Sequence, residues 1–597
     1  MNIPIKTNQI EVDLDTSAYN EKFDIFKIET SDKYFSRGAE ILDTPLLCNG
    51  VKSLYFVSGK CFYVLMTKNS SNKLRLKESL LSTDYGDSIT IGDIDASSVN
   101  QRVSVSLLLN ALSSYELDFL RCSNLTGHLY CFHPSWIRRS GKNSESAIMK
   151  IPCLELSITD EMRLTFSVRT FTSELLKSQI VFKKRRFEQY PKYVLAANNA
   201  LRRKLKADTG KCFILRQTQG DKTDIPFMDI QNVEKFEASK MGVVECVLTL
   251  FNEKYKDICN LQFQPIVNYS AVDSSKTLVK ENKRVVQSLL EESKVKIVDY
   301  IGDAYSSTFC NKVQSILEEK YGITASIGKR ISKDSLNLCV IHNAIYYSGN
   351  NDPHEKSYDG VAVQHITLED FIANVDVAIT TVIHELLIKR DIEKKQISLF
   401  DWQSIGVSSE ISFGMRATIQ EEDRYFFMTI STDGSIEFKE QKLDLFSINE
   451  YTDCINIFSS SKDVVGVIRY ADEEINIIRD TNWVTIPEIE KIHKELSSGN
   501  TYLRGKEKRR ELLSSITDIK AFDVEKSKFY FAGIIGEGMR TGVSDAVNIR
   551  KIEPYKNASL RFEELLPLMN VTFVRNGQLT VLPFPFKYLR EYIQSLQ

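Results

Sequence analysis

The clearest indication of the fold comes from five segments: KVKIVDYIG (294–302), STFCNKVQSILEEKYG (307–322), ITASI (323–327), LNLCVIHN (336–343) and VAVQHITLEDFIANVDVAITTVIHELLIKRDI (361–392). The first, third and fourth are short apolar runs, typical of strands buried in a parallel sheet. The second has apolar residues at helical spacing and ends at Gly322, a common residue after a last helical turn. This order of strands and helices predicts a Rossmann-like α/β unit over 294–392.

The segments on either side of this unit are richer in strands. Upstream, 51–66 and 154–171 each predict a hairpin, and the Leu-rich stretch 101–120 predicts a helix. Downstream, a meander with a turn at Asp433-Gly434 leads to two strands, a helix at IPEIEKIHKELSS, a strand at KFYFAGII and a terminal helix. This downstream order is that of a ribonuclease-H-like domain. The chain is therefore expected to be α/β and multidomain, with a mixed α+β N-terminal half.

Composition limits the class of protein. The 597 residues correspond to about three to five domains. The 77 Lys and Arg against 79 Asp and Glu give a net charge of −2, which excludes a globally basic nucleic-acid-binding protein but not a local basic groove. The 11 Cys form no CxxC pair, so reduced, buried thiols in a cytoplasmic protein are expected. Neither a signal peptide nor a membrane span of about 18 apolar residues is predicted.

One segment has the composition of a nucleic-acid-binding surface. KKRRFEQYPKYVLAANNALRRKLK (183–206) holds nine basic residues and one acid, with aromatic residues between them. Lys and Arg neutralise phosphates, and aromatic rings stack on unpaired bases. The competing interpretation is a solvated amphipathic helix with Leu195, Leu201 and Leu205 directed inward. The candidate contacts are Lys183, Lys184, Arg185, Arg186, Lys192, Arg202, Arg203 and Lys204.

Three other places belong together by their order: Ile405-Gly406-Val407-Ser408, read as a strand; Arg479-Asp480-Thr481 at the end of a strand; and Pro583-Phe584-Pro585-Phe586-Lys587-Tyr588-Leu589-Arg590 entering the last helix. They resemble the PIWI domain of Argonaute proteins, in which these places usually read I-G-x-D, R-D-G and P-x-P-x-x-Y-x-H or -D. The unit at 294–392 then resembles the MID domain. Taken alone, Asp480 also fits a cap of the following helix, and the last segment also fits a terminal helix docked on a core.

The resemblance covers roughly 290–597 and implies four parts. These are an N-terminal domain at 1–125, a linker with a diverged PAZ-like region at 126–275, a MID-like domain at 285–395 and a PIWI-like domain at 396–597. The family's MID pocket holds the 5′ end of a guide strand with a Tyr or His, a Lys four residues later, a Gln and further Lys residues.

The residues at the places of that pocket depart from the family pattern. Thr308 and Lys312 have the first spacing, Thr324-Ala325-Ser326 replace the Gln, and Lys329, Arg330 and Lys333 follow. The helix N-terminus is expected to add free N–H groups for an anion. Lys312 alone reads equally well as a solvated surface lysine. No cofactor is expected, with a Mg²⁺ ion at the guide 5′ phosphate left as an open alternative.

The departures from the PIWI pattern bear on catalysis. In the family, four acidic or His groups hold two divalent cations, and hard cations prefer carboxylate oxygens. Ser408 and Arg590 stand where two of these groups are expected, and Asp480 remains, in a suggested salt bridge with Arg590. The resemblance therefore implies a nuclease-inactive protein without bound metal. If the register is shifted, the ligands are instead drawn from Asp401, Glu410 and Asp433, and the chain is an active metal-dependent nuclease.

The resemblance implies a defence protein. It would bind a short guide oligonucleotide, pair it with a complementary plasmid or phage strand, and recruit an effector such as a helicase or nuclease, because the chain has no P-loop of its own. Two alternatives remain open: the active ribonuclease-H-like nuclease, and a protein-interaction scaffold that keeps the PIWI fold and binds no nucleic acid.

Overall fold

The computed structural model forms two compact units: unit 1 comprises residues 1–267, 483–514 and 535–546, and unit 2 comprises 268–482, 515–534 and 547–597. No helix in the part of the chain that the structure describes is long and apolar enough to cross a membrane. The described residues are 5–30, 43, 50–58, 61–81, 88–115, 119–141, 146–179, 190–196, 199–215, 225–273, 283–347, 353, 356, 358, 360–371, 375–399, 402–442, 449–498, 518–532, 547–569 and 582–596.

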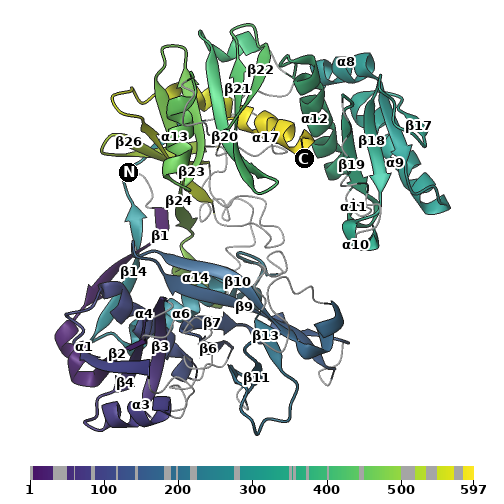
Figure 1. Cartoon of the computed structure of the whole chain (residues 1–597). Coiled ribbons are helices and arrows are strands. Elements are labelled where there is room, and N and C mark those ends of the chain that lie inside the picture. Colours follow the sequence, from purple (N-terminus) through teal and green to yellow (C-terminus); the bar gives the residue numbers. More distant parts are fainter. Residues whose placement is uncertain are drawn as a thin grey trace. The chain divides into compact units, whose positions relative to one another are not determined.

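Unit 1 contains a four-stranded antiparallel sheet in the order β3-β4-β2-β5 (Figure 1). Its strands are β2 (Phe23–Thr30), β3 (Val51–Ser58), β4 (Cys61–Thr67) and β5 (Ile89–Ile94), with α1 (Thr16–Lys22) and α3 (Asn72–Leu81) beside them. The β3–β4 pairing confirms the hairpin predicted at 51–66. The helix α4 (Gln101–Ala111), predicted within 101–120, is buried along most of its length, and its Asn110 amide donates to the carbonyl oxygens of Leu54 and Gly127.

The second sheet of unit 1 has the order β12-β11-β13-β10-β9-β7-β6, with β8 beside β9. The hairpin of β9 and β10 confirms the prediction for 154–171. The strands are β6 (Arg121–Leu125), β7 (His128–Phe132), β8 (Arg138–Arg139), β9 (Ile148–Ile158), β10 (Leu164–Ser173), β11 (Tyr193–Leu195), β12 (Leu201–Arg203) and β13 (Phe213–Leu215).

The interpretation of 183–206 as an amphipathic helix is wrong for its described part. β11 and β12 pair antiparallel, and the turn between them includes Asn199 at φ 60°, a left-handed conformation that Asn tolerates and a helix interior does not. Leu201 is buried as expected, but Leu205 is 40% exposed.

A segment from late in the sequence belongs to unit 1. The strand β24 (Ile475–Ile486) ends against β1 (Ile5–Leu14), which also pairs with β14 (Cys259–Ile266). The predicted helix then follows as α14 (Ile489–Ser497), packed on α5 (Val233–Glu237) and α6 (Lys240–Lys254). His493 of α14 stacks on Phe236 and lies 2.8 Å from the buried Glu245 carboxylate, which holds α14 to this unit.

The parallel sheet of unit 2 confirms the Rossmann-like prediction. Its order is β17-β16-β18-β19, and all three pairings are parallel. The helices α9 and α12 pack against each other and against the sheet (Figure 1), and α9 ends at Gly322 in the left-handed conformation as predicted. The elements are α8 (Lys283–Ser293), β16 (Val295–Asp299), α9 (Ala304–Tyr321), β17 (Ser326–Gly328), β18 (Leu336–Ile341), α10 (Ala344–Tyr347), β19 (Val363–Thr367), α11 (Leu368–Phe371) and α12 (Val375–Lys394).

The other sheet of unit 2 has the order β15-β25-β26-β27-β24-β23-β20-β21-β22. The meander β20–β21–β22 is followed by α13 and the pair β23–β24, and β20 runs antiparallel to both β21 and β23. The elements are β15 (Ser270–Asp273), β20 (Ile411–Ile419), β21 (Glu422–Ile430), β22 (Ile436–Gln441), α13 (Thr452–Ser460), β23 (Val464–Tyr470), β25 (Asp518–Val524), β26 (Ser527–Ala532), β27 (Asn548–Pro554), α16 (Phe562–Met569) and α17 (Pro585–Ser595).

Helices lie on both faces of this sheet. The apolar residues of α13 pack with Tyr425 and Phe427, whereas α17 packs on the opposite face through Phe586, whose ring stacks edge-on with Phe413. Phe584, Phe586, Tyr588 and Leu589 are all buried, so the P-x-P-x-x-Y segment docks a terminal helix onto the core. The fold as a whole is the predicted mixed α/β multidomain class, and the finer division into four domains stays a prediction.

Candidate nucleic-acid interface

The loops after β16, β17 and β18 meet at one edge of the parallel sheet, because the three strands carry the chain in the same direction. In open α/β sheets, ligands bind in the crevice outside this carboxyl edge. The loop after β16 leads into α9, and the loop after β17 carries Lys329 and Arg330. After β18, His342 and Asn343 lead into the short helix α10. A ligand is therefore expected at this carboxyl edge.

The short helix α10 after β18 carries an exposed aromatic ring that the preceding residues support. The Tyr346 ring lies on the imidazole of His342, with centroids 3.7 Å apart and planes 24° apart, and Tyr346 is 64% exposed. His342 Nδ1 contacts the Glu369 carboxylate, and the backbone N–H of Asn343 donates to that carboxylate at 2.9 Å. The backbone N–H of His342 donates to the Tyr347 hydroxyl at 3.2 Å. A ring held in this way can stack on an unpaired base.

Carboxylates gather at the same edge. Burial acts to raise the pKa of Glu369, but hydrogen bonds from His342 and the backbone outweigh it and lower that pKa. At the start of α9, the backbone N–H of Ser306 donates to Asp303 at 2.6 Å and lowers the pKa of Asp303. Asp299, 8% exposed, accepts from the N–H groups of Ile301 and Gly302 and from the Ser306 hydroxyl.

This arrangement corrects the expectation of free N–H groups at the start of the helix that contains Lys312. The N–H groups of Gly302 and Ser306 already donate to the chain's own carboxylates. An anion at this place would meet Asp299 and Asp303, since a capping carboxylate occupies the position that an incoming phosphate would use. The helix start therefore offers fewer free N–H groups than expected, and its binding of a phosphate stays a prediction.

Only some of the predicted MID residues lie at the carboxyl edge. Lys329 and Arg330 are exposed where β17 ends, at the carboxyl edge, whereas Lys333 is exposed further along the loop, next to Ser332, which bonds to Asn337 of β18. The Thr308 hydroxyl donates to the carbonyl of Ala304 within its own helix. Lys312 is exposed about 12 Å along α9 from its first residue, at 1.5 Å per residue.

Three cations in the described part of the basic segment are engaged within the chain. Arg202 donates two hydrogen bonds of 2.7 Å to Asp208 and holds the pKa of that carboxyl at about 2. The Arg203 guanidinium lies over the Tyr193 ring, 5.9 Å from its centroid, and interacts with Asp43, whose pKa burial raises to about 7. Lys204 donates to the carbonyl of Gly210. These cations are therefore less available to phosphates than the sequence suggested.

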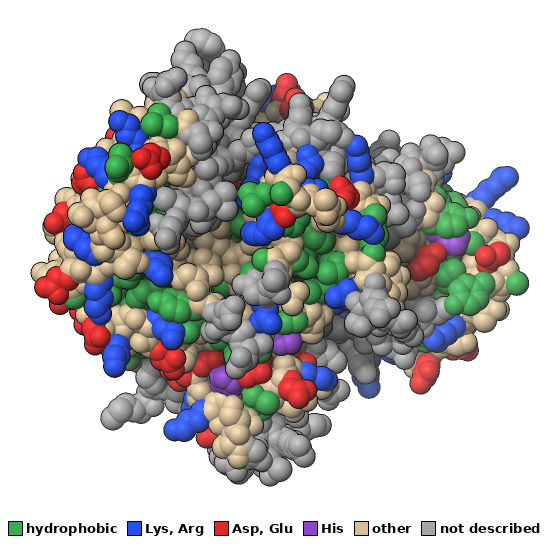
Figure 2. All heavy atoms as spheres, turned by 90° about the horizontal axis from the view of Figure 1, so that it is seen from below, with side chains coloured by type: hydrophobic (Ala, Val, Ile, Leu, Met, Phe, Trp, Pro, Cys, Tyr) green, Lys and Arg blue, Asp and Glu red, His purple; other side chains and the backbone are tan. Residues whose placement is uncertain are grey.

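Other cations of this region remain open to solvent. Lys206, the last basic residue of the segment 183–206, and Lys211 are exposed on either side of the Asp208 turn, and neither was among the candidate contacts. Lys192 is half-buried and acts electrostatically on Glu174. Lys183, Lys184, Arg185 and Arg186 lie outside the described residues, as does the second basic run at 504–510. On the face seen in Figure 2, blue side chains are interspersed with red ones, and its described residues form no continuous basic field.

The three PIWI-like places differ from their predicted structures. Residues Trp402–Ile405 form a short 3-10 helix and Gly406 turns at φ 79°, so Ser408 precedes the sheet and does not lie on a strand. Asp480 lies in the middle of β24 and pairs with Arg550 of β27 at 2.9 Å, not with Arg590. The cap of α14 is Glu488, so Asp480 is not a helix cap either. Arg590 is exposed on α17.

The alternative ligand set does not assemble in the described part of the chain. Glu410 is exposed before β20, and Asp433 accepts from the backbone and hydroxyl of Ser435 in the turn after β21. Asp401 lies outside the described residues. Among the residues that the structure describes, no group of three or more His, Cys, Asp or Glu side chains could hold a metal ion. Whether the chain cleaves nucleic acid stays a prediction.

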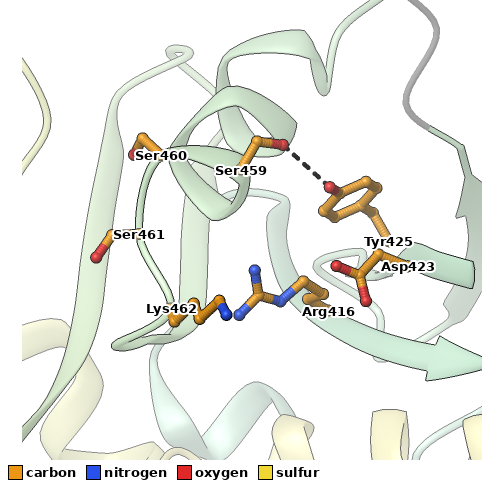
Figure 3. A pocket seen from close by; sticks show the side chains of 7 residues that line it. All are labelled: Arg416, Asp423, Tyr425, Ser459, Ser460, Ser461 and Lys462. Atoms are coloured by element: carbon orange, nitrogen blue, oxygen red, sulfur yellow. Dashed lines mark hydrogen bonds between the residues drawn. The ribbon is translucent and has the colours of Figure 1, made fainter. Parts of the chain in front are cut away.

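A pocket of about 490 Å³ is lined by residues of β20, β21 and the end of α13 (Figure 3). Tyr425 of this lining packs with α13, on the face of the sheet opposite α17. Arg416 of β20 donates to the carbonyl of Phe458 at 3.0 Å, and the Tyr425 hydroxyl is 3.0 Å from that of Ser459. Arg416 thus satisfies a carbonyl in the last turn of α13, where a cation is favoured by the helix dipole. The full lining is Arg416, Asp423, Tyr425, Ser459, Ser460, Ser461 and Lys462.

The sequence did not predict the stacked rings at the carboxyl edge of the parallel sheet or the pocket at Arg416. The signal for the carboxyl edge was present in HNAIYY (342–347), a His and two Tyr directly after a buried strand. Arg416 was not singled out because the first strand of the meander was placed at 405–409, whereas β20 begins at Ile411. The pocket is lined by two cations, Arg416 and Lys462, and one carboxylate, Asp423, so its net charge disfavours a divalent cation.

No family model and no curated protein matches the chain. Solved structures match nearly its whole length. Marinitoga piezophila Argonaute in complex with 5′ OH guide RNA is 10% identical, with a TM-score of 0.39 over 99% of this chain and 98% of that one. Kluyveromyces polysporus Argonaute with a guide RNA is 8% identical, with a TM-score of 0.42 over 98% and 92%. Drosophila Piwi is 9% identical, with a TM-score of 0.36 over 100% and 97%. At these values no residue role transfers to this chain.

Proposed function

We propose that the chain is an Argonaute-like protein that binds a short guide oligonucleotide and pairs it with a complementary strand. The observation that carries this proposal is the exposed Tyr346 ring, held on His342 at the carboxyl edge of a parallel sheet. A stacking platform at that edge suits the terminal base of a single strand, and Lys329 and Arg330 at the same edge suit its backbone phosphates. The order of the α/β unit and the strand meander along the chain adds support.

The charges at the edge favour a guide that begins with a 5′ hydroxyl. Three carboxylates lie near the start of α9 and the segment His342–Tyr347: those of Asp299, Asp303 and Glu369. A terminal phosphate carries close to two negative charges at neutral pH, and like charges repel strongly where water is partly excluded. A 5′ hydroxyl avoids this repulsion and can donate a hydrogen bond to a carboxylate.

The direct test is extraction of nucleic acid from the purified full-length chain, followed by sequencing and by 5′-end labelling with and without phosphatase treatment. We expect short strands of narrow length that are labelled without phosphatase. Titration of matched oligonucleotides should give an affinity for the 5′-hydroxyl form at least equal to that for the 5′-phosphorylated form. Absence of bound nucleic acid, with no affinity for either oligonucleotide, would favour a scaffold that binds protein alone.

The proposal includes the absence of intrinsic cleavage. It is supported by the pairing of Asp480 with Arg550 and by the cationic lining of the pocket at Arg416, neither of which suits a divalent cation. Guide-loaded protein incubated with complementary strand and Mg²⁺ or Mn²⁺ should leave that strand intact. Specific cleavage that is lost in Asp480→Ala would overturn this part of the proposal.

A protein that recognises a target without cutting it needs an effector to act on it. The proposal therefore includes recruitment of a helicase, nuclease or other effector, in the role that the resemblance to Argonaute proteins implies, defence against plasmids or phage. Affinity purification of the chain from its own cells, with and without a target plasmid, is the test. A protein partner that is enriched only when guide and target are both present would support recruitment.

A further inference from the structure

We propose that Cys122 and Cys131 form a redox-active pair, joined as a disulfide by exchange with a small-molecule disulfide while the β6–β7 hairpin is open to solvent. The two residues lie directly opposite each other on β6 and β7. Their sulfur atoms are 2.9 Å apart, although both thiols are free. A disulfide bond is about 2.05 Å long, so the sulfurs need to approach by less than about 1 Å.

The hairpin turn fixes this register. Leu125 pairs with His128, and the two residues between them, Thr126 and Gly127, have φ values of 52° and 78°. Positive φ at both central positions defines the tight turn that matches the twist of paired strands. A Cβ at Gly127 would lie 2.5 Å from the backbone nitrogen of Phe56, so glycine is required there. A shift of one residue in the pairing register would turn the two thiols to opposite faces of the sheet. The turn therefore keeps the thiols facing each other.

Burial controls when the pair can react. Cys131 is 0% exposed and Cys122 6% exposed, and burial raises the pKa of Cys131 well above that of a free thiol. The thiolate is the nucleophile in exchange, so the folded hairpin reacts slowly in both directions. Exchange is therefore confined to the time before β6 and β7 are buried, or to openings of the hairpin, and folding then protects whichever state was formed.

The reaction balances with glutathione disulfide as the oxidant. The thiolate of one cysteine attacks a sulfur of glutathione disulfide, forming a mixed disulfide and releasing one glutathione. The second cysteine attacks the protein-bound sulfur of that mixed disulfide and releases the second glutathione. Each protein thiol loses its proton to a departing glutathione thiolate, so one protein disulfide and two glutathione thiols result, and two electrons pass from the protein to glutathione.

Two neighbouring thiols provide internal controls. Cys153 is 0% exposed and Cys246 is 9% exposed, and both lie near enough to Cys122 to interact electrostatically. Among the described residues, only Cys122 and Cys131 are in sulfur–sulfur contact. Among these four neighbouring thiols, exchange governed by exposure alone would favour Cys246, whereas exchange governed by register joins Cys122 to Cys131.

The test uses the full-length chain, unfolded in denaturant and refolded in a glutathione redox buffer or in excess reductant. Free thiols are blocked with N-ethylmaleimide, and peptides are mapped by mass spectrometry. We expect a cross-linked Cys122–Cys131 peptide, two hydrogen masses lighter than the reduced pair, only in the redox buffer. Native protein placed in the same buffer without unfolding should form it at least tenfold more slowly. In Cys122→Ser, Cys131 should instead retain a glutathione adduct.

Two outcomes would overturn the proposal. One is full alkylation of both cysteines after refolding in the redox buffer, in wild-type protein whose circular dichroism has returned to the native spectrum. The other is a cross-link from Cys122 or Cys131 to Cys153 or Cys246 in similar yield. Both measurements are made on the wild-type chain, so they hold even if a serine variant fails to fold.

Discussion

In the parallel sheet of unit 2, every strand carries the chain toward the same edge, whereas in the antiparallel sheet neighbouring strands end at opposite edges. Loop residues that follow different parallel strands are therefore brought together, as at Lys329, Arg330 and His342. Residues that follow β23 and β20 are carried apart. A ligand site built from loops can thus be inferred from strand order in the first sheet, but not in the second without the pairing register.

The same contrast predicts different consequences of substitution. At the carboxyl edge of the parallel sheet, the residues of interest are exposed, so substitution should change binding and leave stability almost unchanged. On and beside the antiparallel sheet, positions such as Gly466 and Tyr588 lie at buried contacts with the core, so substitution there should change stability. Each of the four predictions below tests one side of this contrast.

The largest expected effect is on the antiparallel sheet, at Gly466 of β23. A Cβ at this position would lie 2.5 Å from Cζ of Phe586, a ring that is 1% exposed in the core. Gly466→Val should lower the free energy of unfolding by about 3 kcal/mol, because an overpacked core cannot move the ring aside. Denaturant titration measures this. The matched control is Gly92→Val in β5, where a Cβ would meet only the carbonyl of Lys27 at 4.0 Å.

The next effect concerns the docking of α17 through Tyr588. The Tyr588 hydroxyl donates to Asp391 at 2.8 Å, and Asp391 is 0% exposed. Tyr588→Phe should cost about 1–3 kcal/mol of stability, since a buried carboxylate loses one of its donors. Tyr592→Phe is the control, because that ring stacks on Phe438 and is only partly buried. Equal losses in the two variants would mean that the Asp391 hydrogen bond contributes nothing specific.

Much of the fold could be predicted from sequence because its elements have strong local signals. The parallel unit combines apolar strands with a helix that ends at Gly322, and each of these features is local. The strand end at Asp480 was misplaced because Arg-Asp reads as a boundary, although the β-branched and aromatic residues of TNWVTI continue the strand to Ile486. The short helix α13 and the strands β15, β25 and β27 were missed, since each depends on long-range pairing or packing.

The candidate site was less predictable than the fold, for a physical reason. Residue type and spacing place Lys329 and Arg330 directly after a strand, as they lie in the structure, and their role in binding stays a prediction. The stacking of Tyr346 on His342 depends on how the chain turns after β18 into α10. The hydrogen bonds from Arg202 to Asp208 depend on a turn that brings together two residues six positions apart. A charge in the sequence does not reveal whether an intramolecular partner already satisfies it.

The third prediction addresses the exposed ring at the carboxyl edge. Tyr346→Ala should lower the affinity for a short single strand by about 1–3 kcal/mol, the usual contribution of stacking on one base, with no change in the denaturation midpoint. Fluorescence anisotropy with a 5′-hydroxyl oligonucleotide measures the loss. Tyr346→Phe keeps the ring and should bind as the wild type does. A comparable loss of stability in Tyr346→Ala would mean that the ring is needed to keep α10 folded, and does not serve binding alone.

The smallest expected effect is electrostatic and concerns Lys329 and Arg330. If both contact phosphates of a bound single strand, their joint replacement by Ala removes two contacts, and each contact contributes about 0.7 to the slope of log affinity against log salt. The slope should therefore become shallower by about 1.4, whatever the sequence of the oligonucleotide. Lys312→Ala is the matched control, since that exposed lysine lies about 12 Å along α9 from the edge. An equal change in the control would place the bound backbone along α9, and an unchanged slope in the double variant would remove the loop after β17 from the interface.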